Sequence, residues 1–96
     1  MVKHMIIWKL NDDASIDCKQ EIKLALEGLV GKIDGLVEMH ILTNPYECSS
    51  GDLAMDSLFE SKEALDFYQK HPLHVEIASN LVRPNVSVRL SFDYEI

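Results

Sequence analysis

Hydrophobic and polar residues alternate in four segments of the chain, a pattern typical of β-strands with one buried face. The four segments are residues 2–10, 36–43, 52–60 and 86–95. We expect the more apolar face of each strand to lie under helices. On the first strand that face consists of Val2, His4, Ile6, Trp8 and Leu10. On the last strand it consists of Val86, Val88, Leu90, Phe92 and Tyr94.

Apolar residues after the first strand recur with the spacing of a helix, which predicts an amphipathic helix over residues 16–33. Ser15 is the expected N-cap, and Gly35 ends the segment. Gly28 and Gly31 would lie inside this helix and destabilise it by about 1 kcal/mol each relative to alanine. The apolar positions are Ile22, Ala25, Leu26, Leu29, Val30 and Ile33.

A second helix is predicted from Ser61, which caps it with Ala64 at the N3 position, to about Lys70. Pro72 interrupts this helix because it lacks a backbone N–H and restricts the residue before it. Residues 73–82 form a further short helical segment, and the Arg-Pro-Asn sequence at 83–85 breaks it.

The predicted order of elements is β-α-β-β-α-β, which is the ferredoxin-like pattern. We therefore expect an α+β fold, with a four-stranded antiparallel sheet and two main helices on one face. Ninety-six residues allow a single domain over 1–96.

The second face of the sheet mixes apolar residues with opposite charges. A solvated face would not need the apolar residues, and a core would not hold the charges, so we expect this open face to pack on a second copy of the chain. The alternative is a monomer with a polar sheet face. The expected residues are Lys3, Met5, Ile7, Lys9, Glu38, His40, Leu42, Ala54, Asp56, Leu58, Ser87, Arg89, Ser91 and Asp93.

The chain is acidic, with a net charge of −7 and 47% hydrophobic residues. This charge repels phosphate backbones and anionic lipid surfaces, so neither nucleic acid nor a membrane is expected as a partner. No apolar run approaches the ~18 residues of a membrane span. The start of the chain lacks the pattern of a signal peptide, and a cytoplasmic location is expected.

Metal and cofactor sites have little support in the residue spacing. Cys18 and Cys48 are far apart and match no metal or redox spacing, so we expect two free thiols. His71 and His74, with Pro72 between them, could supply only two ligands, whereas a metal site in a protein needs three or four. There is no phosphate-binding glycine loop and no haem motif, and no cofactor is predicted.

The segment "YQKHPLHV" at 68–75 carries the main candidate chemistry. His71, next to Pro72, is expected to cap the last carbonyls of the second helix, whereas His74 either points inward or is structural. His40 lies on the opposite sheet face from His4. His4, Tyr68 and His74 are therefore the trio that can converge, and a Tyr–His pair facing a half-buried cavity can perform acid–base chemistry.

Three stretches resemble the stress-responsive A/B barrel (Dabb) family over nearly the whole chain, in the right order. They are "VKHMIIWKL", "SLFESKEALDFYQKHPLHV" and "RLSFDYEI". His4 in the first strand and the "HPLH" segment are the most specific features. The resemblance implies a ferredoxin-like protomer that dimerises by packing two sheets into an α/β barrel.

One branch of that family, the olivetolic acid cyclase type, is similar in layout and cyclises a polyketide without a cofactor. The resemblance implies functional roles for His4, Tyr68 and His74. This chain departs from that branch at two positions, because Leu53 and Leu26 stand where it has a further histidine and a further tyrosine. Both replacements are apolar, so they remove polar groups that would orient a polyketide.

Three functional hypotheses remain at this point. The first is a non-catalytic dimeric protein of undefined role that binds a small hydrophobic ligand or is linked to a stress response. The second is a cofactor-independent cyclase- or lyase-type enzyme that acts on a carbonyl compound through His4, Tyr68 and His74. It requires a cavity between sheet and helices near His4 and His74. The third is a related dimeric barrel enzyme of the monooxygenase kind, against which the His-Pro segment argues.

Overall fold

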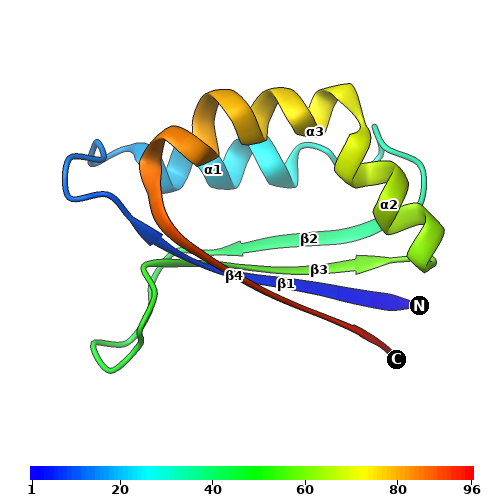
Figure 1. Ribbon diagram of the computed structural model, residues 1–96, viewed down its shortest axis with the longest axis horizontal. Helices are drawn as coiled ribbons and strands as arrows, with labels where there is room; N and C mark the ends of the chain where they lie inside the picture. The colour runs from blue at the N-terminus through cyan, green and yellow to red at the C-terminus, as the bar shows by residue number, and fades with distance from the viewer.

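Four antiparallel strands form one sheet, and the helical segments all cover the same face of it (Figure 1). The computed structural model describes residues 1–96. The strands are arranged in the order β2-β3-β1-β4, which confirms the predicted ferredoxin-like fold. Their bounds are β1 (Val2–Leu10), β2 (Leu36–Leu42), β3 (Leu53–Phe59) and β4 (Val86–Glu95). The helices are α1 (Cys18–Glu27), α2 (Lys62–Lys70) and α3 (Pro72–Ile77).

The first helix is shorter than predicted. Its N-cap is Asp17 rather than Ser15, and the side chain of Asp17 makes no capping hydrogen bond. The helix ends at Glu27, and Gly31 adopts a φ of +89°, which a right-handed helix cannot contain. The predicted apolar stripe still reaches the core, because Leu29 is buried in the turns that follow.

A partly buried network attaches α1 to β2, the outermost strand on that side of the sheet. The Glu27 carboxylate accepts hydrogen bonds from the Ile41 N–H at 2.9 Å and from Lys23 Nζ at 2.8 Å. Lys23 Nζ also donates to the Ile41 carbonyl oxygen at 2.9 Å. The two side chains therefore satisfy a backbone donor and acceptor that an edge strand would otherwise leave open.

The second helix begins as predicted, because the Ser61 hydroxyl accepts a hydrogen bond from the Ala64 N–H at 3.1 Å. Pro72 does not simply end the helical region: it is the first residue of α3. A π-helical turn (Ala78–Val82) and a 3₁₀ turn (Arg83–Asn85) continue the chain to β4. We call α3 and these two turns, residues 72–85, the helical arm. It lies over the sheet beside α1 and returns the chain to the sheet edge (Figure 1). None of the helices is long and apolar enough to cross a membrane.

The face assignment predicted for β4 is wrong, and a β-bulge is the reason. Lys9 pairs with Val88, whereas Leu10 pairs with Val86, so Ser87 is an extra residue in β4. One extra residue reverses which side chains point to each face of the remaining strand. Arg89, Ser91 and Asp93 pair with Trp8, Ile6 and His4 and therefore share the helix side of the sheet.

The apolar residues of β4 beyond the bulge lie on the open face instead. Leu90 is 62% exposed and Phe92 is 69% exposed, and they pair with Ile7 and Met5 of β1. Lys3 and Asp56 form an ion pair of 2.6 Å on the same face. The open face is therefore more apolar than the sequence predicted.

Candidate functional site

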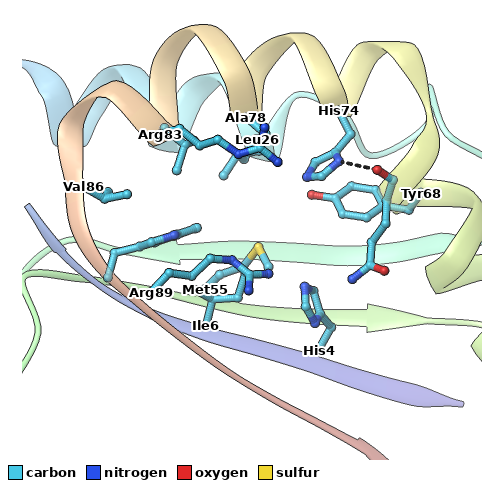
Figure 2. A pocket seen from close by; sticks show the side chains of 13 residues that line it. His4, Ile6, Leu26, Met55, Tyr68, His74, Ala78, Arg83, Val86 and Arg89 are labelled. Carbon is cyan, nitrogen blue, oxygen red and sulfur yellow. Dashed lines mark hydrogen bonds between the residues drawn. The ribbon is translucent and has the colours of Figure 1, made fainter.

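A cavity of about 340 Å³ lies between the sheet and the helical layer. His4, Tyr68 and His74 all line it, so the structure brings the three sequence-predicted residues together (Figure 2). Leu26 also lines the cavity, whereas Leu53 is a core residue that pairs with Trp8. The hydrophobic side of the lining includes Ile6, Trp8, Leu26, Met55, Ala78, Val82 and Val86.

Tyr68 is held on α2 by rings on two sides. Its ring centroid is 5.0 Å from that of Phe59 and 4.2 Å from that of His74. The side chain is 1% exposed, and its hydroxyl has no hydrogen-bond partner in the protein. Burial raises the pKa of Tyr68, against a smaller opposing effect of Arg89. The hydroxyl therefore stays protonated and points into the cavity as a free donor (Figure 2).

His74 on α3 is oriented by the end of the preceding helix. Its Nδ1 lies 3.3 Å from the Gln69 carbonyl oxygen, and because a carbonyl oxygen only accepts, Nδ1 carries the hydrogen. Burial lowers the pKa of His74, and the nearby positive charges of Arg83 and Arg89 lower it further, against the hydrogen bond to the Gln69 carbonyl oxygen, which raises it. The ring is therefore neutral near pH 7, with a lone pair on Nε2 that can accept a proton.

His4 reaches the cavity from β1 on the opposite wall (Figure 2). It is 2% exposed, and its Nδ1 is hydrogen-bonded to the Asp93 carboxylate on the neighbouring strand β4. An ionised carboxylate only accepts, so His4 Nδ1 donates and its Nε2 is left for other partners. The Ser57 hydroxyl donates to the His4 backbone oxygen at 2.6 Å and ties this part of β1 to β3.

Asp93, Arg83 and Arg89 are site residues that the sequence did not reveal. The alternation predicts Asp93 and Arg89 on the open face, and only the bulge at Ser87 turns them toward the helices. The sequence predicts only that the segment containing Arg83 ends the preceding helix. In the structure Arg83 belongs to a 3₁₀ turn beside the cavity. Perfect alternation carries no signal for a bulge, so pattern alone could not have located these residues.

His71 lies outside this cavity at the junction of α2 and α3. Its Nδ1 accepts a hydrogen bond from the Leu73 N–H at 3.1 Å, so the side chain caps the start of α3. The expectation that it caps the last carbonyls of α2 is wrong; its backbone N–H, not its side chain, bonds to the Tyr68 carbonyl oxygen. His40 lies exposed on the open face, as predicted.

No metal site emerges from the side-chain arrangement, since no group of three or more histidine, cysteine, aspartate or glutamate side chains converges. Of the two thiols, Cys18 is buried in the core and Cys48 is exposed. Burial raises the pKa of the Cys18 thiol, and the neighbouring Glu21 carboxylate adds to that effect. Neither cysteine lines the cavity.

Comparison with known structures shows that this protomer architecture recurs. A dimeric protein of unknown function from Bacteroides fragilis is 29% identical, with a TM-score of 0.84 over 99% of this chain and 95% of that one. A protein from Arabidopsis thaliana is 28% identical, with a TM-score of 0.86 over 100% of this chain and 95% of that one. A hydroxynitrile lyase from Passiflora edulis shares the fold at 17% identity, with a TM-score of 0.85 over 99% of this chain and 92% of that one.

Among curated proteins, none matches the sequence. The model of one protein family, the stress responsive A/B barrel domain, matches residues 2–96. That match spans every strand and helix, including the strands that carry His4 and Asp93 and the helices that carry Tyr68 and His74. The chain therefore belongs to the stress-responsive A/B barrel (Dabb) family.

Proposed function

We propose that the protein binds a small carbonyl compound in the cavity and moves a proton at the carbon next to the carbonyl group. The observation that carries this proposal is the pairing of Tyr68 with His74. A buried hydroxyl without a partner is unfavourable by about 1–3 kcal/mol, so an occupant that offers an acceptor is bound preferentially there. The neutral imidazole beside it supplies a base at the same place.

The proton transfer uses the two side chains together. Tyr68 donates a hydrogen bond to the carbonyl oxygen, and His74 Nε2 takes a proton from the adjacent carbon. The electrons of the broken C–H bond move into the carbon–carbon bond, and negative charge develops on the oxygen that faces Tyr68. Return of the proton from Nε2 completes the cycle. If a carbon electrophile of the same molecule takes the place of the returning proton, a carbon–carbon bond forms, which is the reaction of a cyclase. The reverse reaction, in which such a bond is cleaved, is that of a lyase.

His4 acts from the sheet side of the cavity as a positioning or proton-relay group. Asp93 holds the hydrogen on Nδ1 and fixes the ring, so that Nε2 presents a single acceptor to a polar atom of the occupant. A carboxylate bound to an imidazole in this way also stabilises the imidazolium form when charge moves in the site.

The remaining lining selects an occupant with an apolar body. Ile6, Leu26 and Met55 supply hydrophobic surface beside the polar groups. Pockets that bind small molecules are typically of this kind, with volumes of roughly 300–1,000 Å³, mostly apolar walls and a few placed polar groups. Leu26 also favours a second candidate function, ligand binding without catalysis, because its apolar side chain cannot orient a polar substrate.

The assembly that we propose for this protein is a homodimer formed through the open sheet face. The face exposes Met5, Ile7, Leu42, Leu90 and Phe92, and no helix covers it (Figure 1). Contiguous apolar surface of this kind is uncommon on monomers and is typical of interfaces. The Bacteroides fragilis relative is dimeric, which supports the same assembly for this chain.

Deuterium exchange at a ketone tests the proposed chemistry without knowledge of the natural substrate. Butyrophenone in D₂O is followed by proton NMR for loss of its signal next to the carbonyl. We expect the wild-type protein to accelerate exchange over buffer, His74→Gln to abolish the acceleration, and His71→Gln, outside the cavity, to retain it. Binding of the ketone without acceleration would establish the non-catalytic function and overturn the enzymatic one.

A further inference from the structure

All the arginines of the chain lie at the cavity. The sequence contains two arginines, Arg83 and Arg89, and both line the cavity. No aspartate or glutamate is among its lining residues, although the chain as a whole carries a net charge of −7. This cavity of an acidic protein is therefore lined by two cationic side chains, both of which also reach solvent, and by no carboxylate.

Neither guanidinium group has an ionic partner. Arg83 makes one long hydrogen bond, 3.4 Å, to the Ser79 hydroxyl, and neither Arg83 nor Arg89 forms a salt bridge. By contrast, Lys3, Lys23 and Lys62 are each paired with a carboxylate at 2.6–2.8 Å. The other four lysines also lack a salt bridge, but none of them lines the cavity, so the unpaired cations of the cavity are the two arginines.

The two guanidinium groups extend into the cavity from opposite sides. Arg83 reaches in from the helical arm and Arg89 from β4, and both point toward the end of the cavity where Tyr68 and His74 lie (Figure 2). Their charges act on the His74 ring, whose pKa they help to lower, so they lie within electrostatic reach of the proposed reaction centre.

We propose that the natural occupant carries a carboxylate, and that Arg83 and Arg89 bind it beside the Tyr68–His74 pair. The planar guanidinium fork matches a carboxylate with two parallel hydrogen bonds. The apolar walls and the absence of lysine or a glycine-rich loop fit a carboxylate on an apolar body better than a phosphate ester. The carbonyl end of the substrate rests on the proposed function, and the two arginines add the carboxylate end. The substrate class is therefore an oxo acid with an apolar or aromatic body.

A matched pair of ligands isolates the contribution of the carboxylate. 4-Oxo-4-phenylbutanoate and butyrophenone share the aryl ketone skeleton and differ by a carboxylate in place of a methyl group. Trp8, the sole tryptophan, lines the cavity, and its buried indole N–H has no partner. Its single side-chain signal in a nitrogen-15 NMR spectrum therefore reports occupancy of the cavity directly.

We expect the wild-type protein to bind the oxo acid at least about tenfold more tightly than the ketone at low salt, as a charge-assisted pair provides. Added salt narrows that difference. Arg89→Gln and Arg83→Gln remove the preference, whereas Lys32→Gln, which deletes an exposed charge elsewhere, retains it. Ketone binding that persists in each arginine variant shows that the variant is folded, and Arg83, in a surface turn, provides a second variant if Arg89→Gln does not fold.

Equal affinity for the two ligands in the wild type would overturn the carboxylate subsite, and so would a preference that survives both arginine substitutions. Tighter binding of phenyl phosphate than of the oxo acid would overturn the carboxylate assignment in favour of a phosphate. Exchange that proceeds without any preference for the oxo acid leaves the proposed chemistry standing and rejects the subsite. A preference without exchange rejects the chemistry and supports the subsite.

Discussion

The imidazole ring of His74 lies against the phenol ring of Tyr68, with centroids 4.2 Å apart and planes inclined by 35°. The Tyr68 ring carries a protonated hydroxyl without a hydrogen-bond partner. The His74 ring carries a lone pair on Nε2, because its hydrogen is on Nδ1, which donates to the Gln69 carbonyl oxygen. A donor and a base thus meet at one end of a cavity that His4 faces from the other side (Figure 2).

Replacement of Tyr68 by phenylalanine separates a functional hydroxyl from a structural one. The hydroxyl makes no hydrogen bond in the protein, so its removal should leave the free energy of unfolding unchanged or raise it by up to about 1 kcal/mol. Urea denaturation measures this change, with Tyr46→Phe, at an 85% exposed position, as the control. The same variant should lose ketone exchange. A clear loss of stability would mean that the hydroxyl supports the fold.

The lowered pKa of His74 predicts a defined dependence of stability on pH. In the unfolded chain the group titrates at its usual value of about 6.5, whereas in the folded protein it stays neutral to lower pH. As the pH falls below about 6.5, the unfolded state binds the proton first. The contribution of His74 is therefore complete above about pH 6.5 and is lost as the pH falls through the folded pKa.

Urea midpoints measured from about pH 7.5 downward test this dependence. His74→Gln should reduce the loss of stability on acidification, because glutamine takes up no proton. The difference between the two proteins isolates His74 from the other histidines. Parallel curves for wild type and variant would contradict the lowered pKa.

Gly31 and Gly35 offer a matched pair for backbone strain and close packing. Both have positive φ, of +89° and +87°. An added Cβ meets nothing within 4 Å at Gly31, but at Gly35 it would lie 2.5 Å from the Cβ of Ala64 on α2. Gly31→Ala should lower the free energy of unfolding by about 1–2 kcal/mol. Gly35→Ala should lower it further, by about 1–3 kcal/mol more.

Combining Gly35→Ala with Ala64→Gly removes the close approach and keeps the strained φ. We expect this double variant to recover part of the additional loss. Equal destabilisation by Gly31→Ala and Gly35→Ala would show that packing against α2 contributes nothing at that position.

The proposed dimer predicts that one charge on the open face changes the assembly. Leu90 is 62% exposed there, so Leu90→Asp should convert a dimer into a monomer in sedimentation at low micromolar concentration. Leu24→Asp provides the control, because Leu24 is similarly exposed, at 65%, on α1. A wild-type monomer under these conditions would refute the dimer, and a dimer that survives Leu90→Asp would refute this face.

Local signals were sufficient where one short-range interaction determines the structure. The Ser61 cap and the four strands follow from the residues themselves, and the burial of His4 follows from its place among Val2 and Ile6. The sequence also identified the three residues that meet in the cavity. Where the outcome depends on pairing between distant strands, sequence patterns failed.

The bulge at Ser87 illustrates that limit. The regular alternation of residues 86–95 predicts an apolar inner face, yet pairing with β1 turns Arg89 and Asp93 inward. The extra residue exists only relative to the partner strand, so it has no signature in β4 alone. As a result, the charged part of the candidate site could not be found without the fold.

The most direct test of the account is a double-mutant cycle on Tyr68 and His74, measured as the rate of α-proton exchange of 4-oxo-4-phenylbutanoate in D₂O. A general base contributes about 10²–10⁴-fold, so His74→Gln should slow exchange at least about 100-fold. If the two groups act as a unit on one carbonyl, adding Tyr68→Phe to His74→Gln should cause little further loss. Undiminished exchange in His74→Gln, or no acceleration by the wild-type protein, would contradict the account.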